Sequence, residues 1–170
     1  MSELINEWLS APANIIQIIT FIPILWTFHS FVWGKKSRHK KWFAEARENT
    51  GQRPSVLIVD LLIGKDVRAQ VEHFLASDEK LKSIPKERIF NIKHTDKLIV
   101  DNMPALHREI IEVASEIIHA GTDVLHVFMA GPVSAAAMVG AEFSNAGCQV
   151  NLYQNENGKY VNFGPLKHWN

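Results

Sequence analysis

Residues 122–147 contain the feature that most limits how this chain can fold, an apolar strand that leads through a small-residue turn into a helix. The run from Val124 to Phe128 is almost continuously apolar, which is typical of a strand buried on both faces of a parallel sheet. It stops at Ala130-Gly131-Pro132, and an alanine-rich helical pattern follows from Val133. We expect Gly147 to end that helix.

The turn at Ala130 to Val133 is a candidate ligand site. A strand that passes through a tight turn into a helix leaves backbone N–H groups and the positive end of the helix dipole exposed, and such places bind anions, typically a phosphate. Gly131 leaves room for a ligand to approach the backbone closely. The alternative is a plain connection between strand and helix, with Ser134 as the N-cap.

A long segment without charge lies near the N-terminus. No charged residue occurs between Glu7 and Lys35, and residues 14–33 read NIIQIITFIPILWTFHSFVW. A helix of that length spans roughly 30 Å, about the thickness of the bilayer hydrocarbon. Basic residues follow the segment and none precedes it, which predicts an outside N-terminus; a secretory signal peptide has the reverse order. We expect an extracytoplasmic N-terminus at 1–13, a single transmembrane helix at 14–33, a basic juxtamembrane linker at 34–53 and a ligand-binding domain at 54–170.

The expected membrane helix has a polar face. Gln17, Thr20, Ile24 and Thr27 share one side of a helix by their spacing. Because polar groups that face lipid are costly, this face is expected to associate with other helices or to line a pore. The alternative is a monomeric anchor that tolerates one Gln and two Thr.

Charge and cysteine content limit the other classes. The basic run at 35–41 fits a topology signal that also contacts anionic lipids. Residues 51–170 carry 12 Lys and Arg against 14 Asp and Glu, which disfavours binding of polymeric nucleic acid. The single cysteine, Cys148, excludes an internal disulfide and fits a reducing cytoplasm.

The rest of the chain alternates strands with helices. The pattern predicts strands at 55–63, 88–93, 124–128, 148–153 and 159–163, helices at 67–76, 104–120 and from 133, and a hairpin turn at Asn157-Gly158. This order predicts a Rossmann-like three-layer α/β sandwich with a mainly parallel sheet and a C-terminal antiparallel hairpin. Ligands of such sheets bind beyond the carboxyl ends of the strands. That rule places residues 62–66, 94–97 and 130–134 along one rim.

The motifs favour binding over catalysis. The sequence has no GxxxxGK[ST] loop, no GxGxxG, no GxSxG and no helical His pair, so we expect no catalytic residue, metal site or cofactor. Lys65 and Lys97 are the charged residues best placed on the rim for an anionic ligand.

Two segments carry a family resemblance. VLHVFMAGPVSAAAMVG followed by CQVNLYQNENGKYVNF resembles the CARF and SAVED ligand-sensing domains of prokaryotic antiviral defence, especially the C-terminal part of SAVED domains. SAVED domains have two CARF-like halves, and this chain has the length for one that dimerises. Together with one transmembrane helix, it resembles the CRISPR-associated membrane effectors of type III systems.

The resemblance implies a function. Such an effector would bind cyclic oligoadenylate, the tetra-adenylate in the first instance, as a dimer or tetramer in the bacterial inner membrane, and would rearrange its helices to depolarise the membrane. The alternatives are a membrane-tethered ring nuclease or nucleotide hydrolase, and a membrane scaffold without a ligand. Position on the rim and the resemblance together give these candidate ligand-binding residues: Ile63, Gly64, Lys65, Thr95, Lys97, Ala130, Gly131, Pro132, Val133 and Ser134.

Overall fold

The computed structural model describes residues 23, 44, 47, 48 and 51–167. The chain divides into two compact units, Met1–Trp42 and Phe43–Asn170, and nearly all described residues belong to the second. The expected transmembrane helix lies outside the described residues except for Pro23, and so do Gln17, Thr20, Ile24 and Thr27. Among the residues that are described, no helix combines the length and the hydropathy needed to cross a membrane.

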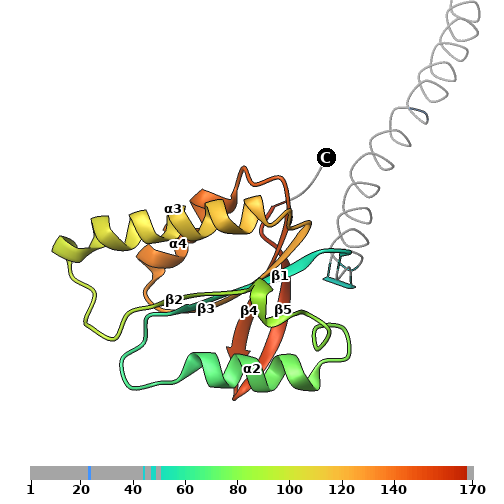
Figure 1. Ribbon diagram of the computed structural model, residues 1–170, viewed down its shortest axis with the longest axis horizontal. Coiled ribbons are helices and arrows are strands. Elements are labelled where there is room, and N and C mark those ends of the chain that lie inside the picture. The colour runs from blue at the N-terminus through green and yellow to red at the C-terminus, as the bar shows by residue number, and fades with distance from the viewer. Residues whose placement is uncertain (1–22, 24–43, 45–46, 49–50, 168–170) are drawn as a thin grey trace, which may run out of the picture. The chain divides into compact units, whose positions relative to one another are not determined.

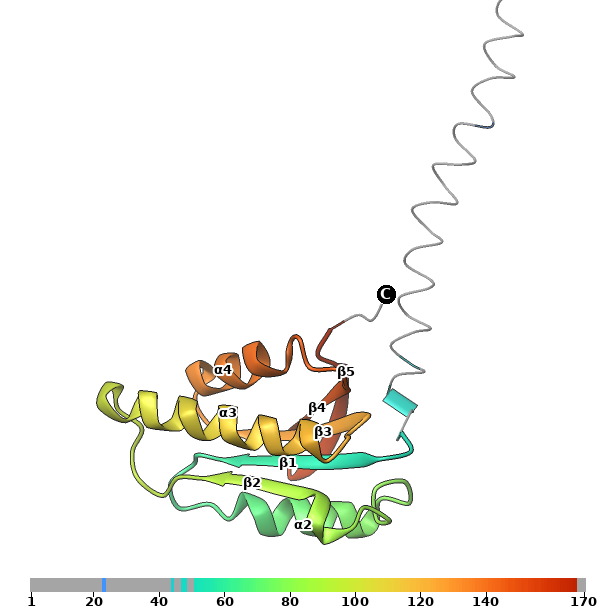
Figure 2. The ribbon, with the colours of Figure 1, turned by 45° about the horizontal axis from the view of Figure 1, so that its top comes forward.

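The second unit is built on one five-stranded sheet. Its strands lie in the order β2-β1-β3-β4-β5, with neighbours parallel except for the antiparallel pair β4 and β5. Helices α3 and α4 cover one face of the sheet and α2 covers the other (Figures 1 and 2). The predicted three-layer α/β sandwich is therefore confirmed. The elements are β1 (Pro54–Asp60), α2 (Val67–Ser77), β2 (Ile89–Lys93), α3 (Met103–His119), β3 (Val124–Ala130), α4 (Val133–Phe143), β4 (Gln149–Glu156) and β5 (Lys159–Pro165).

Strand β1 lies between two hydrophobic clusters. Because side chains alternate along a strand, Leu57 and Val59 pack under α3 and α4, whereas Val56 and Ile58 pack under α2. All four are completely buried. Burial of this kind explains why the run is continuously apolar.

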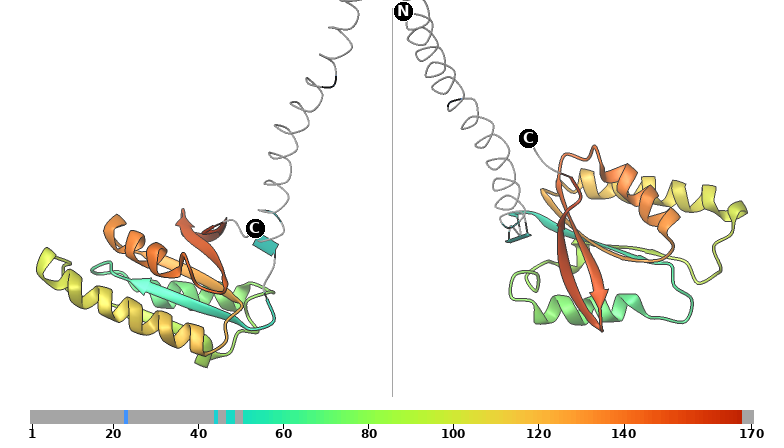
Figure 3. Two further views of the ribbon diagram at one scale, coloured as in Figure 1. Left: turned by 90° about the horizontal axis from the view of Figure 1, so that it is seen from above. Right: turned by 180° about the vertical axis from the view of Figure 1, so that it is seen from behind.

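The antiparallel hairpin forms as predicted. Asn157 and Gly158 have φ angles of 54° and 88°, the left-handed conformation that a tight two-residue hairpin turn requires. Figure 3 shows that β4 and β5 twist away from the direction of the central strands. The turn places Tyr160 beside Phe128 and Phe74 under α2, where the three rings are in contact.

Several predicted boundaries are wrong, including the end of the fourth strand, which lies at Glu156 instead of residue 153. The first strand ends at Asp60 instead of Ile63, and Leu62 and Ile63 are exposed in the following loop. Helix α4 ends at Phe143 instead of at Gly147. Its end is held by Ser144, whose Oγ donates to Ala141 O and whose own carbonyl accepts from Lys167 Nζ. These contacts satisfy carbonyls at the helix end, so no glycine is needed there.

Gly131 does not open space for a ligand. A Cβ atom at this position would lie 2.9 Å from Cβ and 3.1 Å from Cδ1 of Leu61, a residue of the hydrophobic core. The expectation that Gly131 leaves room for a ligand is therefore wrong, because Leu61 fills that room. The glycine allows the strand ends of β1 and β3 to pack closely.

We predict that Gly131→Ala destabilises the domain by about 1–3 kcal/mol, because the added methyl group overpacks the contact with Leu61. Thermal unfolding of the purified chain measures this change. Gly147→Ala is the matched control, because a Cβ atom there meets nothing within 4 Å. Equal melting temperatures for the two variants would contradict the packing argument.

The chain enters the sheet through a carboxylate clamp at Asp123. Its carboxylate accepts hydrogen bonds from the backbone N–H groups of Gln52 (2.8 Å) and Arg53 (3.0 and 3.1 Å). Burial raises the pKa of Asp123, but these backbone hydrogen bonds outweigh it and hold the pKa below its ordinary value of 3.8. Gly51 precedes the clamp with φ of 72°, and a Cβ there would lie 2.5 Å from Asp123 Oδ1.

We predict that Asp123→Asn lowers the free energy of unfolding by about 1 kcal/mol at pH 7, because the amide can accept only part of these bonds. Since the folded-state pKa is lowered, the contribution of the carboxylate is present above the unfolded-state pKa and disappears as the pH falls through the folded-state pKa. The difference from wild type should therefore shrink below about pH 4. Urea unfolding from pH 7 to pH 3 measures it, with the exposed Asp96→Asn as control. A difference that does not depend on pH would contradict the clamp.

Candidate functional site

The candidate site is the rim where β1, β2 and β3 end. The three strands stop at the same level, since Leu61 N donates to Ala130 O (2.8 Å) and His94 N donates to Asp60 O (3.1 Å). The loops that follow therefore share one edge of the sheet, the edge at which ligands of parallel sheets commonly bind. Asn102 holds the second loop by accepting from Ile99 N and donating to Lys97 O, so its side chain does not cap α3.

A hollow of about 330 Å³ lies between the first two loops. It contains four of the residues expected from the sequence: Ile63, Gly64, Lys65 and Thr95. The structure adds Leu62, Asp66, Lys93 and His94 to the lining. The other expected residues do not line this hollow: Lys97 lies farther along the second loop, and Ala130, Gly131, Pro132, Val133 and Ser134 form the separate turn into α4.

The first turn of α2 is not free to bind an anion. Asp66 accepts a hydrogen bond from Ala69 N (3.0 Å), and Asp60 Oδ2 accepts one from Val67 N (3.3 Å). Two carboxylates thus occupy the amides that would otherwise attract a phosphate. An anion in the hollow would depend on Lys65 and Lys93 instead.

The first turn of α4 differs from that of α2. Helix α4 begins at Val133, with Pro132 as its N-cap, and no side chain caps it. The alternative with Ser134 as the N-cap is therefore wrong. The first intrahelical acceptor is Pro132 O, which receives Ala135 N and Ala136 N. The amides of Val133 and Ser134 precede that point and have no acceptor in the helix, so they could donate to an anionic group.

Asp60 adds a buried carboxylate directly below the first loop. It is 1% exposed, and within the described part of the chain no hydrogen-bond donor reaches its Oδ1. A buried carboxylate oxygen without a partner costs free energy. This oxygen would gain from a donor that a ligand or a water molecule brings to the loop.

Exposed apolar side chains gather at the same rim. Eight large hydrophobic residues are exposed in the described part of the chain, and five of them follow the strand ends: Leu62, Ile63, Ile99, Val100 and Val133. Beside them, His94 and Glu109 are joined by a contact of 2.6 Å that ties the second loop to α3. The rim thus combines lysine side chains with apolar side chains, a mixture suited to a ligand that carries both phosphates and bases.

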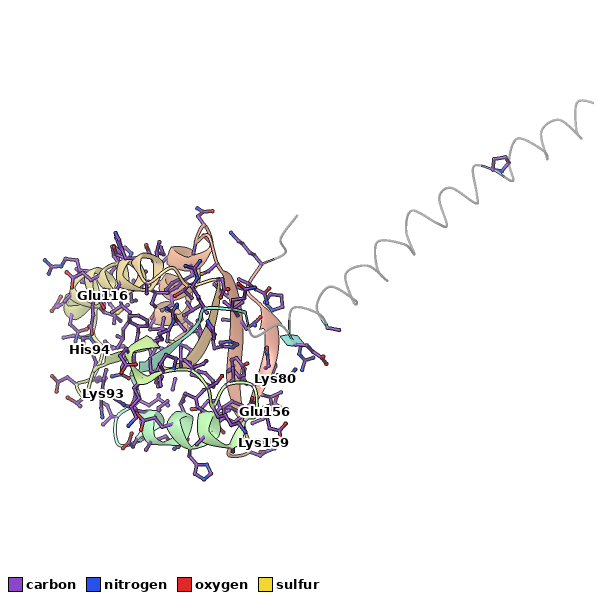
Figure 4. The ribbon with its side chains drawn as sticks, turned by 45° about the vertical axis from the view of Figure 1, so that its right-hand side comes forward. Lys80, Lys93, His94, Glu116, Glu156 and Lys159 are labelled. Carbon is purple, nitrogen blue, oxygen red and sulfur yellow. The ribbon has the colours of Figure 1, made fainter. Side chains whose placement is uncertain are left out.

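A second hollow, which the sequence did not indicate, lies on the α2 side of β4 and β5. It has a volume of about 600 Å³ and mixed walls, in which apolar side chains lie beside the polar groups of His126, Tyr153 and Asn162. Figure 4 shows Lys80 and Lys159 on this side of the molecule and Lys93 and His94 at the rim. The residues that line this second hollow come from segments far apart in the sequence, so no local motif marks the hollow. The one signal was a histidine inside an apolar strand, His126.

In the described part of the chain, no group of three or more His, Cys, Asp or Glu side chains could hold a metal ion. Cys148 is buried, and burial raises the pKa of its thiol, as expected for a packing residue.

Comparison with known proteins agrees with this geometry. The family model for SAVED, the "SMODS-associated and fused to various effectors sensor domain", matches residues 33–165. Similar solved structures include the Cap4 SAVED/CARF-domain containing receptor of Acinetobacter baumannii with 2'3'3'-cAAA, with 22% identity and a TM-score of 0.50 over 71% of this chain and 26% of that chain. The corresponding receptor of Moraxella osloensis gives 20% identity and a TM-score of 0.47 over 71% and 23%.

The similarity to the Acinetobacter receptor extends to the fold, and the chain spans about a quarter of the length of these receptors. No match was found among curated proteins. The family model, by contrast, covers most of the chain, from Trp33 through the last strand. This chain belongs to the SAVED family.

Proposed function

We propose that this chain is a membrane-bound sensor of antiviral defence that binds a cyclic oligoadenylate at the rim and responds by rearranging its N-terminal helices. The observation that carries the proposal is the match of a sensor-domain family over residues 33–165, together with a rim that gathers lysine and apolar side chains. The similar Acinetobacter receptor is described with a cyclic triadenylate. The proposed ligand class is therefore cyclic oligoadenylate, and the screen described below distinguishes the cyclic triadenylate from the tetra-adenylate.

The chemistry of the rim supports this class of ligand. A cyclic oligoadenylate alternates phosphates, which ammonium groups attract, with purine bases, which apolar side chains cover. Lys65 and Lys93 provide the charges beside the first hollow, and the amides of Val133 and Ser134 provide donors at the next loop. We assign the ligand to the span between these two loops.

The same rim supports assembly of several copies. Five of the eight exposed large apolar residues in the described part of the chain follow the strand ends, and exposed apolar surface is a feature of interaction sites. A ligand with rotational symmetry is suited to a site that symmetry-related copies share, so we propose that rims of two or more chains enclose it. Each copy would then contribute its own Lys65 and Ile63.

The response is proposed to occur at residues 14–33. One helix encloses no lumen, so conduction needs several chains with Gln17, Thr20, Ile24 and Thr27 facing inward. The ligand shifts the arrangement of helices only by its difference in affinity for the two states. The proposed location is the bacterial inner membrane, with the N-terminus outside and the sensor in the cytoplasm.

The first test is a thermal-shift screen of the full chain in detergent against cyclic di-, tri-, tetra- and hexa-adenylate. A ligand at 100 times its Kd should stabilise the chain by about 2.7 kcal/mol. Lys65→Gln should weaken binding about ten-fold, because a charge-assisted contact with phosphate is lost. Lys82→Gln, an exposed lysine in the loop after α2, is the control.

Binding by no cyclic oligonucleotide would contradict the proposed function. Equal effects of the two lysine variants would contradict the rim as the site. Mass spectrometry of the recovered ligand completes the screen: intact ligand supports a sensor, and cleaved ligand supports the ring nuclease instead.

The second test concerns the polar face of the N-terminal helix. Replacing Gln17 and Thr20 with Leu keeps the segment apolar, so the chain should still insert into the membrane. If the face lines a pore, ligand binding should persist and depolarisation should be lost. If the face only joins helices, assembly should weaken by about 0.6 kcal/mol for each hydrogen bond. Full ligand-triggered depolarisation by this double variant, at equal membrane levels, would contradict the role of the face in lining a pore.

A further inference from the structure

A helical segment borders the second hollow, which lies on the α2 side of β4 and β5. Arg47 and Glu48 are helical and border the hollow. Asn162 on β5 donates from Nδ2 to the backbone oxygen of Arg47 (3.2 Å). Lys80, in the loop after α2, donates to the backbone oxygen of Glu48 (3.5 Å). Both donors therefore reach main-chain carbonyls of the segment.

Such carbonyls need partners from outside the helix. The last carbonyls of an α-helix have no intrahelical donor and carry the negative end of the helix dipole. An amide N–H and an ammonium group are suitable donors for them. The sheet and the loop after α2 thus supply the cap from residues that lie 115 and 32 positions away in the sequence.

The orientation of Asn162 is fixed by its other bonds. Its Oδ1 accepts from Gly164 N (2.8 Å), so its Nδ2 must face Arg47 O and Tyr153 Oη (3.2 Å). Burial, with a smaller effect of Asp78, raises the pKa of Tyr153, so its hydroxyl keeps its proton. That proton can point to Nδ1 of His126 (3.1 Å). Three hydrogen bonds thus join β3, β4 and β5 to the helical segment: His126 with Tyr153, Tyr153 with Asn162, and Asn162 with Arg47 O.

The charges of the hollow argue for a helix end over an anion. Arg47, Lys80 and Lys159 border it, but so do Glu48 and Asp78. Asp78 is engaged with Lys80 N and Leu81 N, and the carbonyls at the helix end add negative character. The positive and negative groups nearly balance, so the hollow offers little net attraction for a free anion.

We propose that Asn162 and Lys80, at the border of this hollow, form an intramolecular docking site for the main-chain carbonyls of Arg47 and Glu48, and that Asn162 is the residue that holds them. On the other side of residues 49–50, Asp123 binds Gln52 and Arg53. The chain is therefore fixed to the sheet on both sides of that short segment.

Trypsin cleavage after Arg47 tests the docking directly, because the carbonyl that Asn162 binds is the one that the protease must attack. When docking and release are fast, the cleavage rate follows the population of the released state. Loss of one net hydrogen bond of about 1 kcal/mol should raise that population about five-fold. The full chain in detergent is digested without ligand, and the fragment that begins at Glu48 is quantified by mass spectrometry.

Two substitutions of Asn162 separate docking from folding. Asn162→Asp keeps the acceptor for Gly164 N but turns a carboxylate toward Arg47 O, and Asn162→Ala removes the donor without adding charge. Moderate salt screens the new charge in the first variant. Asn145→Asp, at an exposed position between α4 and β4, is the control. We expect about five-fold faster cleavage for both Asn162 variants and no change for the control.

Lys80→Ala provides an independent check at an exposed side chain, where loss of the fold is not expected. It should raise the cleavage rate about two-fold, whereas Lys82→Ala should not. Unchanged cleavage in the Asn162 variants and in Lys80→Ala would overturn the proposal. Because no ligand is added, the result stands whether or not the rim binds a cyclic oligonucleotide.

Discussion

Burial of β1 and β3 on both faces is the constraint on which the rest of the structure depends. Val56 to Val59 are completely buried, and so are Leu125 and Phe128 in the neighbouring strand. Helices must therefore cover both faces of the sheet, and the polar and flexible parts of the chain are left at the two ends of the strands. The rim and the entry clamp at Asp123 occupy those opposite ends. The proposed ligand site and the point where the chain enters the sheet therefore lie at opposite ends of the strands.

The fold could be predicted from the sequence because its signals are local. Alternating strand and helix patterns gave the order of elements, and Asn157-Gly158 gave the hairpin. The rim followed from topology alone, and it brought Ile63, Gly64, Lys65 and Thr95 together. The contacts of Gly131 and the end of α4 could not be predicted, because they depend on Leu61 and Lys167, which are distant in sequence. The second hollow could not be predicted from the sequence for the same reason, since Asn162 and Arg47 are 115 positions apart.

The two ends of the sheet differ in how well their polar groups are satisfied. At the entry, Asp123 accepts from Gln52 and Arg53, and Arg88 donates to the carbonyls of Arg53, Pro54 and Ala120. At the rim, one oxygen of Asp60 has no donor among the described residues, and apolar side chains such as Ile63 and Val100 face solvent. Unsatisfied groups and exposed apolar surface are features that binding can relieve, whereas a satisfied network resists change. This contrast favours the rim as the place where a ligand or another copy of the chain binds.

The same packing restricts how a signal could pass from the rim to the N-terminal segment. A sheet whose central strands are packed on both faces does not deform continuously, because close-packed interiors have little free space. A ligand is therefore expected to order the rim loops or to bring whole domains together, instead of bending β3. Either change moves the domain as one body, and the attachment through Asn162 and Asp123 would carry that displacement to the preceding helix. In the proposed mechanism, a loose attachment would not pass a displacement of the domain to the proposed membrane helix, so the proposed docking site and the proposed ligand site would both be needed.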